Sequence, residues 1–374
     1  MRNLKHFILL FIPLAGCVSE YIPGLTENDE MIVVEGMITD QPGKNTINIY
    51  KTLSIWTKEF RTDVENCRVW ITDDLGNEHH LMEEKIGTYV TDSATFKGIP
   101  GRKYTLHFTA KSNGELHSYE SLPVEMIPVP PIDTVYFEKR DYMYLNLPAE
   151  GCQIYLETHD PADACKFYRW DYKETWEYRL PFNVENRICW ATEKSSGILI
   201  KNTSLLSKNM IARYPVKLIT NPIDRLKVKY CILINQYSLN EDEYYFWERL
   251  QNSVRMVGGL YDIIPSTIPG NIFSREDKLE KVLGYFSVSA VTSRRIFIKE
   301  NFTGRNSLYE LCLPDSTMLT NLPDTINGLN AKLWILYDYS DSVPPSVILT
   351  NKRYCGDCTS KGTNIKPSFW DDDH

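Results

Sequence analysis

The chain has 374 residues, of which 43% are hydrophobic and 24% charged, a balance typical of folded globular proteins. This length exceeds what one ordinary hydrophobic core accommodates and predicts two domains. The net charge of −8 argues against a nucleic-acid partner, because nucleic-acid binding needs Lys and Arg to neutralise phosphates.

Residues 1–16 have the three parts of a secretory signal peptide. Two positive charges come first, an apolar run follows at residues 7–14, and two small residues then precede Cys17. The apolar run is too short to cross a bilayer, which takes about 20 residues. We therefore expect residues 1–16 to be removed on export.

Leu14-Ala15-Gly16-Cys17 resembles the lipobox of bacterial lipoproteins, in which the cysteine thiol takes a diacylglyceryl group. We expect Cys17 to be lipidated and residues 17–29 to form the lipidated N-terminus and tether. No Asp follows Cys17, which favours the outer membrane and leaves its periplasmic and surface faces as alternatives. An ordinary secreted protein with a chance cysteine at the cleavage site is the competing interpretation.

Residues 30–127 alternate short strands with turns rich in Gly, Pro, Asn and Asp. Polar and apolar residues alternate with period two and no helical stretch intervenes, which predicts an Ig-like or prealbumin-like β-sandwich. The expected strands lie at residues 32–39, 45–52, 67–72, 87–91 and 103–109. Three prolines within residues 128–131 predict a domain boundary, and we expect the sandwich to fold on its own.

Residues 132–370 predict a second, mainly β domain with one amphipathic helix. Its expected strands lie at residues 134–137, 152–158, 167–172, 228–235 and 282–289. Asn240 can cap the helix, with Glu243 in capping-box position. An apolar stripe at helical spacing is expected to face the core and comprises Trp247, Leu250, Val254 and Val257. An acidic tail follows at residues 371–374.

Nine cysteines in an exported chain predict disulfide bonds. We expect Cys355 or Cys358 to pair with a cysteine of the second domain, with Cys189 and Cys312 as the favoured partners. Two alternatives for the C-x-x-C motif are half of a zinc site and a redox-active pair. No second motif supplies further zinc ligands, and the residues after Cys358 are a poor helix start, so we expect neither a metal nor a cofactor.

Trp176 and Trp190 lie in a loop-like stretch, residues 173–190, and are candidates for an exposed contact patch. The alternative is that they fill the core, as most large aromatic residues do. The chain has no local signature of a metalloprotease, serine hydrolase, P-loop or dinucleotide-binding enzyme, so we expect no catalysis. A pair of catalytic carboxylates distant in sequence would escape this search.

Several short motifs, in order, resemble the DUF4249 family of uncharacterised lipoproteins of Bacteroidetes. They include Ile32-Val33-Val34-Glu35-Gly36, Pro130-Pro131-Ile132-Asp133, Tyr168-Arg169-Trp170, Gly284-Tyr285-Phe286-Ser287-Val288 and Cys355-Gly356-Asp357-Cys358. The resemblance runs nearly end to end. It implies an outer-membrane lipoprotein, often associated with TonB-dependent receptors, and carries over no catalytic residue.

The leading hypothesis is a non-catalytic, lipid-anchored binding or accessory protein of the cell envelope. Its partners would be the membrane, reached through the lipid, and an outer-membrane receptor or another envelope protein. The alternatives are an exported glycan or peptide hydrolase with scattered acidic residues and a structural or adhesive surface module. An activity screen separates the hydrolase from the other two, and a pull-down separates those from each other.

Overall fold

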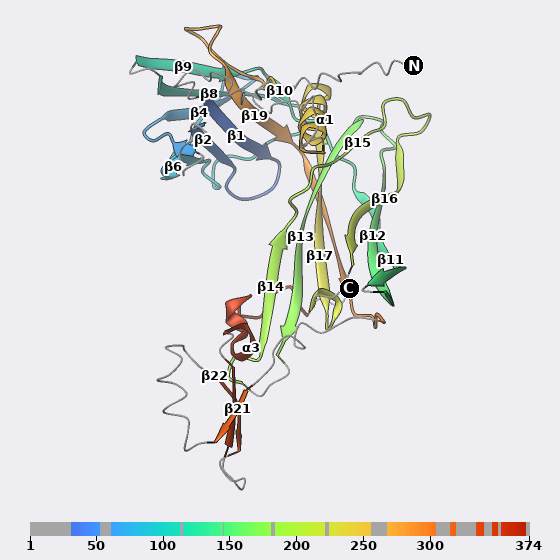
Figure 1. Cartoon of the computed structure of the whole chain (residues 1–374). Helices are drawn as coiled ribbons and strands as arrows, with labels where there is room; N and C mark the ends of the chain where they lie inside the picture. Colours follow the sequence, from blue (N-terminus) through green and yellow to red (C-terminus); the bar gives the residue numbers. More distant parts are fainter. Residues whose placement is uncertain are drawn as a thin grey trace, which may run out of the picture.

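The computed structural model describes residues 31–52, 61–112, 115–144, 146–180, 184–220, 224–255, 268–303, 315–318, 334–339, 346–350 and 353–371. The expected signal peptide, Cys17, the tether, Val257 and Cys312 lie outside these residues. The described part is dominated by strands and contains one long helix, which confirms the predicted mainly β fold. It forms a β-sandwich, a second body of two facing sheets, and a small C-terminal sheet (Figure 1).

The sandwich consists of two six-stranded sheets packed face to face. The first has the order β19-β1-β2-β7-β6 with β3 beside β2; its early strands are β1 (Ile32–Thr39), β2 (Thr46–Thr52), β3 (Arg61–Asp63), β6 (Met82–Lys85) and β7 (Thr88–Val90). The second has the order β18-β9-β8-β4-β5 with β10 beside β8; these include β4 (Arg68–Asp73), β5 (Glu78–His80), β8 (Lys103–Ser112), β9 (Glu115–Ser121) and β10 (Val124–Glu125). Alternate apolar residues of both sheets are fully buried between them, among them Ile38, Ile47, Ile71, Leu106 and Phe108.

Two strands from much later in the chain complete this sandwich. β18 (Ile272–Ser274) pairs with β9, and β19 (Val282–Ser289) runs parallel to β1 along its whole length. Phe286 and Val288 lie fully buried in the same core. The predicted sandwich domain of residues 30–127 is therefore wrong in extent, because it lacks one strand of each sheet. The alternation within β19 predicts a strand, but it carries no information about which sheet the strand joins.

Glycines allow the late strands to approach the early ones closely. Gly284 has φ +89°, and a Cβ there would lie 2.0 Å from the Val34 carbonyl oxygen. A Cβ on Gly270 would lie 1.8 Å from the Gly284 carbonyl oxygen. The Asn271 amide side chain bonds the backbone N–H and C=O of Phe286, each at 2.9 Å. Any larger residue at Gly284 would force β19 away from β1.

The second body packs a five-stranded sheet against a three-stranded one. The first sheet has the order β14-β13-β17-β20 with β15 beside β13; its strands are β13 (Phe167–Arg179), β14 (Ile188–Lys194), β15 (Leu199–Asn202), β17 (Tyr230–Leu239) and β20 (Val291–Ile298). The second consists of β11 (Ile132–Tyr144), β12 (Leu147–His159) and β16 (Met210–Ile219). The core between them includes Ile154, Leu156, Trp170, Ile232 and Ile234. The short 3-10 helix η1 (Asp224–Leu226) precedes β17.

The sandwich and the second body are joined by more than a linker. The chain passes from β19 through Ala290 directly into β20, which pairs with β17. The Ser238 hydroxyl donates to the Ile127 carbonyl (2.5 Å) and accepts from the Ala290 N–H (3.1 Å). Gln236 Nε2 donates to the Pro130 carbonyl at 2.8 Å. The proline-rich segment is thus bonded to β17 and does not act as a free hinge.

The C-terminal part adds a fifth sheet and then returns to β14. The sheet has the order β21-β23-β22, formed by β21 (Asp315–Met318), β22 (Trp334–Tyr339) and β23 (Ser346–Thr350), and is followed by α3 (Arg353–Gly356) and η5 (Cys358–Ser360). Thr363 and Trp190 exchange backbone hydrogen bonds of 2.8 and 3.0 Å. Trp370 is buried, and its carbonyl accepts a hydrogen bond from Lys229 Nζ at 2.7 Å. This segment therefore covers one end of the five-stranded sheet.

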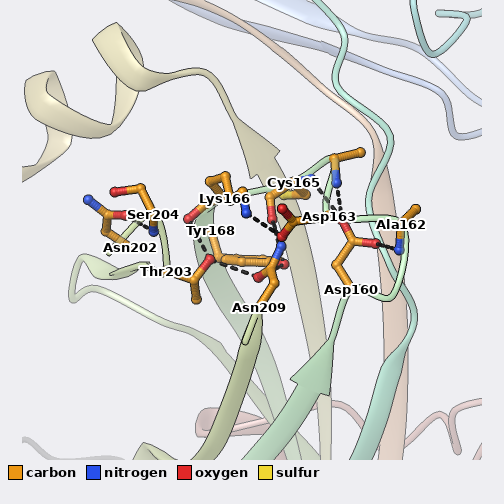
Figure 2. Close-up of polar contacts among 11 residues, drawn as sticks. Asp160, Ala162, Asp163, Cys165, Lys166, Tyr168, Asn202, Thr203, Ser204 and Asn209 are labelled. Atoms are coloured by element: carbon orange, nitrogen blue, oxygen red, sulfur yellow. Dashed lines mark hydrogen bonds and ion pairs between the residues drawn. The ribbon is translucent and has the colours of Figure 1, made fainter. Parts of the chain in front are cut away.

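A polar network joins two connections of the second body (Figure 2). The Asp160 carboxylate accepts backbone N–H bonds from Ala162, Ala164 and Cys165, at 2.8 to 3.0 Å. Asn209 Nδ2 donates to the Cys165 carbonyl (2.6 Å), and Asn209 Oδ1 accepts from the Thr203 hydroxyl (2.8 Å). These bonds hold the connection between β12 and β13 against the connection between β15 and β16. Because the polar side chains bond to other parts of the chain, their role is structural.

Candidate functional site

The helix α1 (Glu241–Arg255) lies between the sandwich and the second body (Figure 1). The Asn240 side chain accepts the backbone N–H of Glu243 at 2.8 Å, so the predicted N-cap is confirmed. Tyr244 packs against Phe167 of the second body, and Phe246 packs against Tyr285 of the sandwich, with ring centroids 5.3 and 5.0 Å apart. Two sides of the helix are therefore buried, one against the second body and one against the sandwich.

One position of the predicted apolar stripe is wrong. Trp247 and Leu250 are partly buried, as expected, but the Val254 side chain is 63% exposed. Ser253 and Glu243 occupy buried positions instead. The helix packs against two bodies at once, which rotates its buried side relative to the stripe that the apolar residues indicate.

A groove lies on the face of the five-stranded sheet that points away from β11, β12 and β16. Alternate residues of β13 and β17 face it, because neighbouring residues of a strand point to opposite sides of a sheet. The pairing places Arg169 beside Tyr237, and Lys173 beside both Leu233 and Lys194. With Trp247 of α1 these residues line a cavity of about 460 Å³, within the size range of small-molecule sites.

Arg169 is held between two aromatic rings in the wall of the groove. Its guanidinium carbon lies 4.8 Å from the ring centre of Tyr237 and 4.6 Å from that of Trp247. One terminal nitrogen lies 3.6 Å from the Met37 sulfur, on β1 of the sandwich. Arg169 Nε is buried and has no hydrogen-bond partner among the residues that the structure describes. The guanidinium is thus fixed in position while part of its hydrogen-bonding capacity is unused.

Asp171 and Glu243 orient the two rings that hold Arg169. Asp171 accepts hydrogen bonds from the Tyr237 hydroxyl (2.8 Å) and from Asn235 Nδ2 (2.7 Å). Burial and this contact raise the pKa of Tyr237, so its hydroxyl stays protonated. Glu243 accepts a hydrogen bond from Trp247 Nε1 at 3.2 Å. Burial raises the pKa of the Glu243 carboxyl, and the nearby positive charge of Arg169 opposes this shift.

A second hollow lies on the other side of Arg169 and Trp247. Its volume is about 410 Å³, and it separates α1 from β1 and β19 of the sandwich. Met37, Leu250 and Tyr285 contribute to its wall. Arg169 and Trp247 line both cavities, so they form a partition at the junction of the two bodies.

The two tryptophans expected in an exposed contact patch do not form one. Trp176 is 5% exposed and packs in the core of the second body. Trp190 is partly buried, and its ring meets that of Trp370 edge-on at a centroid distance of 6.4 Å. The prediction fails because β13 continues to Arg179 and β14 begins at Ile188, so both residues are strand residues with packed neighbours.

The disulfide prediction is confirmed for one pair: Cys189 bonds Cys358, with their Cα atoms 5.7 Å apart. Cys355 is also disulfide-bonded, and its predicted candidate partner Cys312 lies outside the described residues. Because Cys358 bonds Cys189, the C-x-x-C cysteines do not form a pair with each other, and neither thiol is available to zinc. The described residues contain no cluster of three or more metal-binding side chains.

The sequence profile of one family, described as a domain of unknown function (DUF4249), matches residues 18–295. The chain belongs to this family. The DUF4249 match begins directly after Cys17 and spans the sandwich, α1 and every residue of the groove described above. No match to the chain was found among curated proteins.

In the sequence, Arg169 is one residue of the motif Tyr168-Arg169-Trp170, and that motif by itself gives it no role. The one signal that could have singled it out is alternation: Tyr168 and Trp170 are apolar neighbours that must face a core, so Arg169 must face away from it. Its ring partners come from β17 and from α1, far away in sequence. No local pattern reveals that meeting.

Proposed function

We propose that this protein is a lipid-anchored binding protein of the bacterial cell envelope, held at the outer membrane, that takes a small ligand in the groove around Arg169. The observation that carries this proposal is the groove itself. A guanidinium with an unused, buried donor stands in a small-molecule-sized cavity, and two oriented aromatic rings hold it there.

The lipid anchor is supported by the signal-peptide pattern and by Leu14-Ala15-Gly16-Cys17. In the described residues no helix is long and apolar enough to cross a membrane. Replacing Cys17 by Ala should abolish fatty-acid labelling and release the protein from the membrane fraction. Unchanged labelling of the Cys17→Ala variant would refute the anchor.

Binding without turnover is supported by the chemistry of the groove lining. Its acidic residue is Asp171, whose two carboxylate oxygens accept bonds from Tyr237 and Asn235. A hydrolase of the glycosidase type needs two carboxylates facing each other across the scissile bond. The lining instead combines cationic, aromatic and hydroxyl side chains, which suit recognition.

We also propose that the anchored protein associates with an outer-membrane receptor of the TonB-dependent class. This part of the proposal rests on the family resemblance alone. Cross-linking of intact cells followed by purification of the lipoprotein should recover such a receptor, and the Cys17→Ala variant serves as the control that has lost its membrane location. Recovery of the same set of proteins with both variants would contradict the association.

The groove can be tested by filling it. Ser196 lines the groove, whereas Ser204 is exposed elsewhere in the second body, so Ser196→Trp and Ser204→Trp form a matched pair. We expect fractions of a small-molecule extract of the envelope to raise the unfolding temperature of the wild type and of Ser204→Trp, but not of Ser196→Trp. An equal shift in all three proteins would place binding elsewhere, and turnover of a glycan, peptide or ester would favour the hydrolase.

A further inference from the structure

We propose that the ligand of this groove carries a carboxylate or phosphate group and that Arg169 binds this group. The inference rests on the proposed function and adds the chemical class of the ligand. Its basis is that the Arg169 guanidinium has more N–H donors than the described chain offers it acceptors.

A guanidinium has five N–H donors and always carries its charge. The described chain gives Arg169 two ring faces and a methionine sulfur, and Nε has no acceptor although it is buried. Leaving a charged donor without an acceptor costs more free energy than leaving a neutral one. An oxyanion in the groove would supply acceptors to the guanidinium N–H groups that face it, in the planar geometry that arginine prefers.

The nearest acidic groups do not fill this role. Asp171 lies two positions along the same strand and already accepts from Tyr237 and Asn235. Glu243 is completely buried, and its Oε1 accepts from Trp247, whereas its Oε2 has no hydrogen-bond partner among the described residues. No ion pair within those residues joins Glu243 to Arg169. Burial raises the pKa of Glu243, and the positive charge of Arg169 opposes that shift.

Most of the charged side chains in the lining are cationic, like Arg169. Lys173 and Lys194 lie directly opposite each other on β13 and β14, and both face the groove. Asp171 is the acidic residue of the lining, so three cationic side chains face one carboxylate. Both lysines are exposed and therefore screened by salt, so they attract an anion into the groove more than they hold it.

The aromatic rings explain why the anion would be bound selectively. Tyr237 and Trp247 fix the plane of the guanidinium, and their own hydrogen bonds to Asp171 and Glu243 fix the rings. A donor fork that is already oriented loses little entropy when the ligand arrives. A lysine at this position would keep the charge but lose the fork.

The test is calorimetric titration of the full-length lipoprotein in detergent with matched pairs of probes. D-glucuronate against D-glucose tests a carboxylate, and glucose 6-phosphate against glucose tests a phosphate. We expect one acidic member to bind roughly 10- to 100-fold more tightly than its neutral partner. Arg169→Gln should remove that advantage, and Arg169→Lys should restore only part of it.

Lys201→Gln is the control, because Lys201 is an exposed cation on β15 outside the groove. It should leave the affinity unchanged, and the unfolding temperature of every variant shows whether it has folded. Equal binding of acidic and neutral probes, unaffected by Arg169→Gln but lost in Ser196→Trp, would overturn the anionic ligand and leave the groove as a binding site. Equal binding of an acidic probe by wild type and Ser196→Trp would overturn the groove as well. If no acidic probe binds at millimolar concentration, the proposed ligand class is wrong.

Discussion

Replacing Phe286 by Ala should destabilise the opposite sheet of the sandwich, although the two are far apart in sequence. Phe286 is completely buried in the core that β4 and β8 share with β19, and its backbone bonds to Asn271 do not depend on the ring. Removing a buried phenylalanine ring costs about 3–5 kcal/mol, because the transfer free energy of the ring and a cavity term add. Close packing of β1 against β19 limits relaxation and favours the upper half of this range.

Hydrogen exchange measured by mass spectrometry can quantify this loss of stability separately in the peptides of β4 and β8. At about 1.4 kcal/mol per factor of ten, their protection should fall roughly a hundredfold to several thousandfold. Phe273→Ala is the matched control, because Phe273 lies on neighbouring β18 and its side chain is 39% exposed. Unchanged exchange in β4 and β8 of Phe286→Ala would show that the sandwich does not depend on β19 and would refute the discontinuous domain.

Two further predictions follow from the disulfide and the buried carboxyl. Replacing Cys189 and Cys358 together by Ser should lower the free energy of unfolding by about 2–4 kcal/mol and expose the segment after residue 358 to protease, and resistance equal to that of the wild type would contradict this. The raised pKa of Glu243 means that its contribution to stability is complete below the ordinary value of 4.5 and is lost as pH rises through the higher folded-state value. The urea concentration at the unfolding midpoint should therefore fall less between pH 4 and pH 8 for Glu243→Gln than for the wild type. If the midpoints of the two proteins change with pH in parallel, this would argue against a titrating Glu243.

The strands could be predicted from sequence because each carries its own alternation. Residues 282–289, for example, were expected as a strand and form β19 with the same bounds. Its membership in the sandwich could not be predicted, because the pairing with β1 depends on Gly284 and Gly270 meeting a distant backbone. The proline-rich segment indicated a boundary between the sandwich and the second body. The chain crosses that boundary a second time at Ala290.

The site was less accessible to sequence reasoning than the fold. Aromatic residues at Trp176 and Trp190 suggested a contact surface, but burial in a longer β13 removes Trp176 from it. Arg169 gains its environment from Tyr237 and Trp247, which other elements supply. The disulfide of Cys189 with Cys358 was predictable in outline, since an exported chain favours cross-links.

Native mass spectrometry of the lipoprotein, gently extracted from membranes, tests the central claim most directly, because it weighs the anchor and the ligand together. We expect a chain that begins at an acylated Cys17 and carries one bound small molecule. The bound molecule should be retained by Ser204→Trp and absent from Ser196→Trp. A chain without acyl groups, or an equal amount of bound molecule on Ser196→Trp, would contradict a lipid-anchored protein that binds its ligand in the groove around Arg169.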